Sequence, residues 1–122
     1  MRVIIADDSE ILRSRLVEML SEIEGIKIVA EAKDTKEAIE VIKDHRPDVV
    51  IMDIKMPGND GIKAIETIRK AKGHRPKIIV FTNYPYLQYR KRCLDAGADH
   101  FFYKATEFRK LVDVLGELAQ VT

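Results

Sequence analysis

Five short apolar runs, each separated from the next by a longer amphipathic stretch, constrain the fold of this chain more than any other feature of its sequence. Most residues in the runs are β-branched or aromatic, and apolar and polar positions do not alternate. Strands have this composition when both faces of a parallel sheet are covered. The runs are Val3–Ala6, Ile26–Ala30, Val49–Met52, Ile78–Phe81 and His100–Tyr103.

The stretches between the runs carry apolar residues at helical spacing. In the second stretch, Asp34 is placed as an N-cap, Glu37 completes a capping-box pattern, and Pro47 prevents the helix from continuing. The fourth stretch, Tyr86–Ala96, has the poorest apolar stripe, and we expect it to dock most weakly. Strand–helix alternation repeated five times predicts an α/β fold, a five-stranded parallel sheet with right-handed crossovers flanked by five helices.

The length of 122 residues predicts a single domain over residues 1–122, with no output domain, and we expect it to be cytoplasmic. The 21 basic and 20 acidic residues nearly cancel, so we expect no direct binding to nucleic acid or membrane. The basic runs Arg69–Lys77 and Arg90–Arg92 are interpreted as solvated faces. One cysteine, Cys93, fits a reducing compartment and is expected to be a packed thiol. Arg2 is followed at once by a strand-like run, which leaves no room for a signal peptide.

Polar side chains follow four of the five predicted strands. Asp7 and Asp8 follow the first, Asp53 the third, Thr82 the fourth and Lys104 the fifth. In a parallel sheet all carboxyl ends of the strands lie along one edge, where open α/β sheets bind ligands. We therefore expect three carboxylates, a hydroxyl and an ammonium in one crevice. The second run is followed by fewer polar side chains that could join this crevice, which suits a strand at the edge of the sheet.

Three carboxylates in one crevice repel one another, because each pair at about 4 Å costs roughly 4 kcal/mol at an effective dielectric near 20. Either one of them stays protonated or a cation neutralises them. Oxygen ligands without a useful histidine indicate a hard cation, Mg²⁺ above all. Lys104 and Thr82 would then stabilise a phosphoryl group. Such a site is equipped for phosphoryl transfer to a carboxylate nucleophile.

Over its whole length the sequence resembles the receiver domains of two-component response regulators. The resemblance implies a doubly wound, flavodoxin-like sheet with the strand order 2-1-3-4-5. It also implies a sensor histidine kinase or phosphotransfer protein as partner, and it leaves room for a phosphorylation-dependent homodimer and for an output partner or output domain that the sequence does not identify. The matching motifs are Asp7–Asp8, Asp53–Gly61, Thr82, Gly97–Asp99, Phe101 and Lys104.

The resemblance assigns the metal site and the phosphoacceptor to particular residues. Asp53 matches the phosphoacceptor, which also binds the metal. Asp8 would bind the metal directly and Asp7 through water, and the backbone carbonyl of Lys55 would be a further ligand.

The resemblance also assigns the residues that contact the phosphoryl group and the switch. Thr82 and Lys104 match the two phosphoryl-contacting residues. Phe101 matches an aromatic residue that swings between exposed and buried positions, filling space that Thr82 vacates on phosphorylation. Met56–Pro57 and Asp60–Gly61 match the loop before the third helix.

Some residues depart from the family pattern. Ala105 follows Lys104 where the family usually has a proline after a cis bond, so we predict a trans bond and a rearranged loop. Asn83 stands where small residues are more usual. Lys55 and Tyr84 occupy variable positions beside the acceptor, and we expect them to set the lifetime of the acyl phosphate.

Other interpretations of the same residues remain open. Asp7 and Asp8 could simply cap the first helix. A phosphorylation-independent interaction module would use the fold without the switch, and Asn83 and Ala105 keep this alternative alive. A phosphohydrolase with an aspartyl nucleophile is a further alternative, although the Asp-x-Asp pair usual after the first strand of such enzymes is missing.

Overall fold

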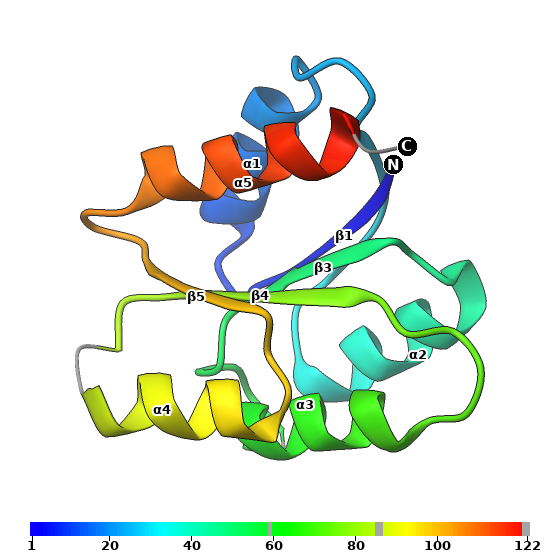
Figure 1. Ribbon diagram of the computed structural model, residues 1–122, viewed down its shortest axis with the longest axis vertical. Coiled ribbons are helices and arrows are strands. Elements are labelled where there is room, and N and C mark those ends of the chain that lie inside the picture. The colour runs from blue at the N-terminus through cyan, green and yellow to red at the C-terminus, as the bar shows by residue number, and fades with distance from the viewer. Residues whose placement is uncertain (59, 85–86, 121–122) are drawn as a thin grey trace.

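The computed structural model describes residues 1–58, 60–84 and 87–120, in which strands and helices alternate throughout (Figure 1). Strands β3 and β5 have the predicted bounds. In chain order the elements are β1 (Arg2–Ala6), α1 (Glu10–Leu20), β2 (Lys27–Ala32), α2 (Thr35–His45), β3 (Val49–Met52), α3 (Gly61–Lys70), β4 (Lys77–Thr82), α4 (Leu87–Ala96), β5 (His100–Tyr103) and α5 (Phe108–Gln120).

The strands form one parallel sheet in the order β2-β1-β3-β4-β5, which confirms the predicted flavodoxin-like topology. Helices α1 and α5 cover one face of the sheet, and α2, α3 and α4 cover the other (Figure 1). All strands run the same way, so their carboxyl ends share one edge, at the left of Figure 1. Of the described helices, none has the length and apolar character needed to cross a membrane.

Strands β1, β2 and β4 are longer than predicted, because pairing with a neighbour extends them. The second strand was expected to end at Ala30, but β2 continues through Glu31 and Ala32, which pair with Ile5 and Ala6 of β1. The edge position of β2 explains why a charged residue is tolerated there, since Glu31 remains exposed.

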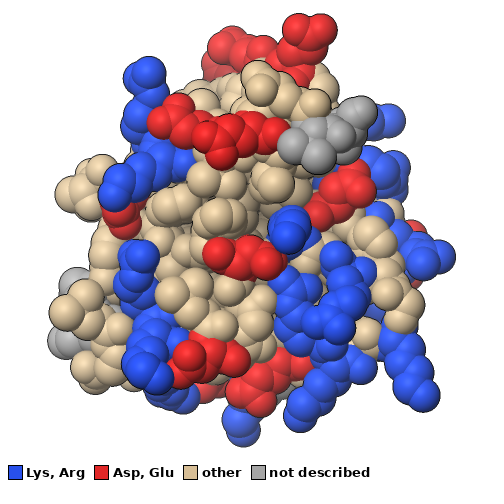
Figure 2. Space-filling view, in the orientation of Figure 1, with Lys and Arg blue, Asp and Glu red and all other residues tan. Residues whose placement is uncertain are grey.

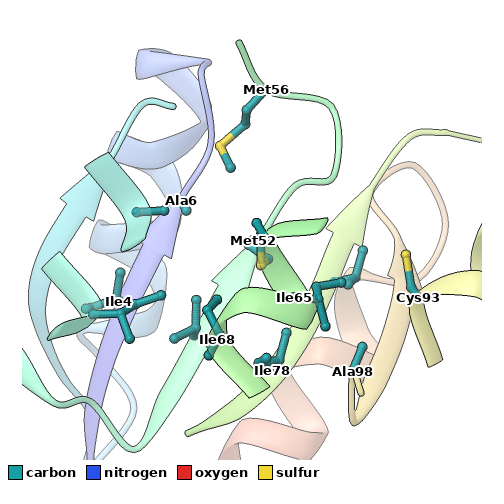
Figure 3. Packing of buried hydrophobic residues seen from close by; sticks show 14 of the residues in the cluster. Ile4, Ala6, Met52, Met56, Ile65, Ile68, Ile78, Cys93 and Ala98 are labelled. Atoms are coloured by element: carbon teal, nitrogen blue, oxygen red, sulfur yellow. The ribbon is translucent and has the colours of Figure 1, made fainter. Parts of the chain in front are cut away.

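Two apolar cores lie on opposite faces of the sheet, which explains why the strands show no alternation. Figure 3 shows one of them, in which Ile4 of β1, Met52 of β3 and Ile78 of β4 pack with side chains of α3 and α4. The neighbouring strand residues point the other way: Val3 and Ile5 belong to the second core, which also contains the buried leucines of α1 and α5. Burial on both faces is what the sequence predicted.

The ends of α2 follow the predicted signals. The Asp34 side chain accepts a hydrogen bond from the backbone N–H of Glu37 at 2.8 Å. The helix ends at His45, and Arg46 adopts a left-handed conformation with φ of 46° directly before Pro47. These contacts confirm both the N-cap and the stop.

Helix α4 is the most weakly buried of the helices, as expected. Within Leu87–Ala96 only Cys93 is buried. Burial raises the pKa of the Cys93 thiol to about 11, so it packs as an unreactive apolar group. Tyr86, where the sequence placed the helix start, lies outside the described residues.

The interpretation of Arg69 as part of a solvated face is wrong. Its side chain is 14% exposed, and its guanidinium donates hydrogen bonds to the carbonyls of Gly97 and Pro76, at 2.8 and 2.6 Å, and to the carboxylate of Asp99 at 2.6 Å. Asp99 also accepts from the backbone N–H of Ile78. Arg69 therefore joins α3 to the segments before β4 and β5.

Candidate functional site

The carboxyl edge of the sheet brings the predicted site residues together. Backbone hydrogen bonds continue past the ends of the strands. The N–H of Asp53 donates to the carbonyl of Ala6, and the N–H of Lys104 donates to the carbonyl of Thr82. Thr82 was expected to follow the fourth strand, but it is the last residue of β4. The sheet thereby sets the relative positions of Asp7, Asp53, Thr82 and Lys104.

Asp53 is 6% exposed, and donors hold both of its carboxylate oxygens. Its Oδ1 accepts from the Thr82 hydroxyl at 2.6 Å and from the backbone N–H of Lys55 at 2.9 Å. Its Oδ2 accepts from Lys104 Nζ at 2.7 Å. These charge-assisted bonds fix the orientation of the carboxylate.

Lys104 is shared between two carboxylates, because its Nζ also lies 2.5 Å from Asp7 Oδ2. Burial alone would lower the pKa of Lys104, but the hydrogen bonds to Asp53 and Asp7 outweigh it and raise the pKa. Burial raises the pKa of Asp7, although Lys104 and the N–H of Ser9 oppose the shift. Lys104 is thus favoured as a cation, whereas burial disfavours the ionised form of Asp7.

The acidic residues of the site fit a hard divalent cation. Carboxylate oxygens of Asp7, Asp8 and Asp53 lie within 4.8 Å of one another. Asp8 is exposed, so the group can be reached from solvent. Burial, with a smaller contribution from the Asp53 carboxylate, raises the pKa of Asp7, so a cation at this position would favour its ionised form. An all-oxygen set of this kind suits Mg²⁺, which keeps several waters as ligands.

The conformation around Phe101 is the one assigned from the sequence to the phosphorylated state. Phe101 is 2% exposed, and the Thr82 hydroxyl is already directed at Asp53. Arg90 of α4 covers Phe101, with its guanidinium carbon 5.9 Å from the ring centroid and an N–H donated to the Phe101 carbonyl at 3.3 Å. Arg90 is therefore not simply part of a solvated face.

The loop before α3 is held at both ends. Met56 is buried in the core on the α2–α4 side, and the carbonyl of Pro57 accepts from the backbone N–H of Thr35 at 3.3 Å. At the far end the Asp60 side chain accepts from the N–H of Ile62 at 2.9 Å and caps α3. The loop that begins at the acceptor is thus anchored to α2 and α3.

The structure describes each position that departs from the family pattern. The described part of the chain contains no cis peptide bond, which confirms the trans bond between Lys104 and Ala105. Lys55 Nζ lies 4.9 Å from the centroid of the Tyr84 ring, within range of a cation–π interaction. Tyr84 in turn meets Tyr89 edge to face, with centroids 4.5 Å apart. Asn83 is exposed.

One residue at the site was missed from the sequence. Arg13 of α1 donates to the backbone carbonyl of Asp7 and, through Nε, to Glu31 at 3.3 Å. It ties the loop carrying the acidic pair to the edge strand β2. Nothing in the sequence distinguishes Arg13 from other basic residues of an amphipathic helix.

Comparison with known proteins identifies relatives along nearly the whole chain. Residues 3–116 match the family model described as the response regulator receiver domain. The chain is 42% identical over 118 residues to the transcriptional regulatory protein PdtaR of Mycobacterium tuberculosis, an alignment covering 97% of this chain and 56% of PdtaR. It is 36% identical over 122 residues to a protein-glutamate methylesterase/protein-glutamine glutaminase of Alkalilimnicola ehrlichii, covering 98% of this chain and 30% of that protein.

The solved structures agree with the sequence relatives. The signal receiver domain of the response regulator NarL from Mycobacterium tuberculosis superposes with a TM-score of 0.88 at 28% identity, covering 98% of this chain and 95% of that one. The response regulator domain of CheB from Thermotoga maritima gives a TM-score of 0.85 at 30% identity, covering 98% and 93%. The chain spans about half or less of the length of the two curated relatives.

Proposed function

Because the chain belongs to the response regulator receiver domain family, we propose that its Asp53 accepts a phosphoryl group from a sensor histidine kinase or a phosphotransfer protein. One observation carries the proposal: the buried Asp53 carboxylate is held between the Thr82 hydroxyl and the Lys104 ammonium, beside two further carboxylates. This arrangement combines a nucleophile, hydrogen-bond donors for phosphoryl oxygens and a group of ligands for a cation.

The proposed step forms a bond between a carboxylate oxygen of Asp53 and phosphorus. It breaks the donor's nitrogen–phosphorus bond, and the electron pair stays on the histidine nitrogen. Mg²⁺ bound by Asp7, Asp8, Asp53 and the Lys55 carbonyl would neutralise charge on the phosphoryl oxygens. Lys104 and Thr82, which now contact Asp53, would donate to those oxygens. Both donors already lie beside Asp53, so each would only have to exchange a carboxylate oxygen for a phosphoryl oxygen.

The switch that we propose connects the acceptor to α4 and β5. A phosphoryl group on Asp53 would hold Thr82 against the site and so favour the buried position of Phe101, which Arg90 of α4 covers. Without the phosphoryl group this arrangement, which the structure shows, would be less strongly favoured, and the conformation with Phe101 turned outward would be more populated. A switch of this kind shifts the populations of two existing conformations. The weakly buried α4 is the element that can respond at lowest cost.

The output, the location and the oligomeric state of the protein are proposed from its family. The relatives include a transcriptional regulatory protein and a protein-glutamate methylesterase/protein-glutamine glutaminase, and each is longer than this chain. An output partner or output domain, a cytoplasmic location and a phosphorylation-dependent homodimer are all compatible with a receiver domain. The absence of direct nucleic-acid binding stays a prediction from the charge balance.

Incubation with Mg²⁺ and acetyl phosphate tests the proposed function. We expect intact-mass spectrometry to show a gain of one phosphate, and we expect no gain when the divalent cation is removed with a chelator. No gain under any condition would contradict the proposal and favour a phosphorylation-independent interaction module. Rapid turnover of an added phosphoester would instead favour a phosphohydrolase.

Lys55 and Tyr84 are expected to set the lifetime of the acyl phosphate, because they meet beside the acceptor and can restrict the approach of water. We expect the Lys55→Ala and Tyr84→Ala variants to lose phosphate at rates that differ from wild type by several-fold. The rate is measured by the decay of the phosphorylated mass after the donor is removed. Lys33→Ala, an exposed lysine outside the site, is the control. Unchanged decay in both variants would refute this role.

A further inference from the structure

A cavity of about 380 Å³ lies between the carboxyl-terminal parts of α2 and α3. Helices of this fold run antiparallel to the strands that they follow, so the cavity is at the edge where the strands begin, opposite the Asp53 site (Figure 1). Its volume is in the range of small-molecule sites. Nothing in the proposed phosphoryl chemistry uses it.

The floor of the cavity is apolar. Ile42 and Ile68 are buried and Ile39 is partly buried, and all three line the space together with Ala71. A ligand with an apolar body would remove this surface from water, a gain of roughly 25 cal/mol for each Å² buried.

The rim of the cavity is basic. Lys43, Arg46 and Lys72 line it, and none of the described lining residues is acidic. Figure 2 shows basic side chains gathered at the lower right, where the end of α3 and the following loop lie in Figure 1. Two helix carboxyl termini bring about half a negative charge each. They compensate only part of three full positive charges, so the rim attracts anions.

The walls are held by backbone contacts and need little ordering on binding. Arg46 N–H donates to the carbonyl of Ile42 at 3.0 Å and fixes the left-handed end of α2. His74, which lines another side, has its Nε2 hydrogen-bonded to the carbonyl of Pro47. A preformed site loses little affinity to ordering.

We propose that this cavity binds a small amphiphilic anion, one whose apolar body rests on Ile39, Ile42 and Ile68 and whose carboxylate, sulfonate or phosphate group meets Lys43, Arg46 and Lys72. The apolar floor selects the body of the ligand and the basic rim selects its charge. The proposal is independent of phosphorylation at Asp53, and it adds a ligand site on the far side of the domain.

The probe for the test is 8-anilinonaphthalene-1-sulfonate, an apolar anion, compared with N-phenyl-1-naphthylamine, which has the same body without the sulfonate. We expect one sulfonate probe to bind per chain and the neutral probe to bind at least tenfold more weakly. The variant Lys43→Gln/Arg46→Asn/Lys72→Gln should weaken sulfonate binding at least tenfold. Asparagine is chosen at position 46 because it tolerates the left-handed conformation.

A matched variant controls for the loss of three positive charges. Lys33→Gln/Lys36→Gln/Lys63→Gln removes three exposed lysines that do not line the cavity, and it should bind the probe within twofold of wild type. Equal affinities in the two triple variants would overturn the proposal. Both sets change exposed side chains only, so we expect both to fold, and melting curves verify this.

The position of the bound probe is tested separately. The methyl resonances of Ile39, Ile42 and Ile68 should shift on titration, while those of Ile5 and Ile79 in the opposite core should not. Ala71→Trp, which places a large ring at an exposed residue that lines the cavity, should abolish these shifts. Two results would contradict binding in this cavity: resonance shifts centred on the Asp53 site, or unchanged probe binding by a folded Ala71→Trp variant. If Ala71→Trp does not fold, the triple variants decide.

Discussion

Replacing Asp53 with asparagine is expected to abolish the phosphate-sized mass gain that the wild type shows with Mg²⁺ and acetyl phosphate. Asparagine has nearly the same shape, and its carbonyl oxygen can keep the bonds from the Thr82 hydroxyl and the Lys55 N–H. The amide lacks the negative charge that makes the carboxylate a nucleophile and a metal ligand. The expected effect is therefore complete loss of phosphorylation in a folded protein.

Asp34→Asn is the matched control for this variant. It makes the same change from carboxylate to amide outside the site, and asparagine is also a good N-cap, so the bond to the N–H of Glu37 can persist. We expect this variant to gain phosphate like the wild type, as measured by intact mass. A phosphate on the Asp53→Asn protein would show that the acceptor is another residue.

Gly61→Ala should destabilise the fold by about 3 kcal/mol or more, the upper range of overpacking in a close-packed site. A Cβ at position 61 would lie 2.5 Å from both the Cα and the carbonyl oxygen of Ile54. These are backbone atoms of the residue after Asp53, and they cannot turn aside as a flexible side chain can. Chemical denaturation measures the loss. Because Ile54 adjoins the acceptor, we also expect slower phosphorylation of whatever protein remains folded.

Gly116→Ala provides the contrast for Gly61→Ala. Gly116 lies inside α5, and a Cβ there would meet nothing within 4 Å. Alanine in the middle of a helix is favoured over glycine by roughly 0.5–1 kcal/mol, so this variant should be more stable than the wild type. Equal stability of the two variants would show that the close approach of Gly61 to Ile54 does not limit the packing of α3.

The strands and the central site could be predicted because they depend on local pattern and on one property of parallel sheets. Runs buried on both faces predicted β3 and β5 to the residue. Once the strands were placed, their carboxyl ends brought Asp53, Thr82 and Lys104 to one edge, and the structure joins these residues by hydrogen bonds. The true end of β2 escaped prediction because Glu31 is polar, and only its pairing with Ile5 makes it part of the strand.

The partners of the long basic side chains escaped prediction for a different reason. Arg13, Arg69 and Arg90 stand in amphipathic or basic stretches that are typical of solvated faces. Their guanidinium groups instead reach backbone carbonyls of Asp7, Gly97, Pro76 and Phe101. An arginine carries no local signal for which carbonyl it will reach, because the acceptors lie 6 to 28 residues away, outside its own helix.

The sequence by itself determined the order of the elements, the sheet and the residues at its carboxyl edge, because hydrophobic periodicity and strand direction are local and repetitive. Only the tertiary structure decided that Phe101 is buried beneath Arg90, that Gly61 lies against the backbone of Ile54, and that a basic rim surrounds an apolar cavity between α2 and α3. Each of these features arises where one element packs against another or against a loop, and close packing of that kind depends on all the surrounding side chains at once.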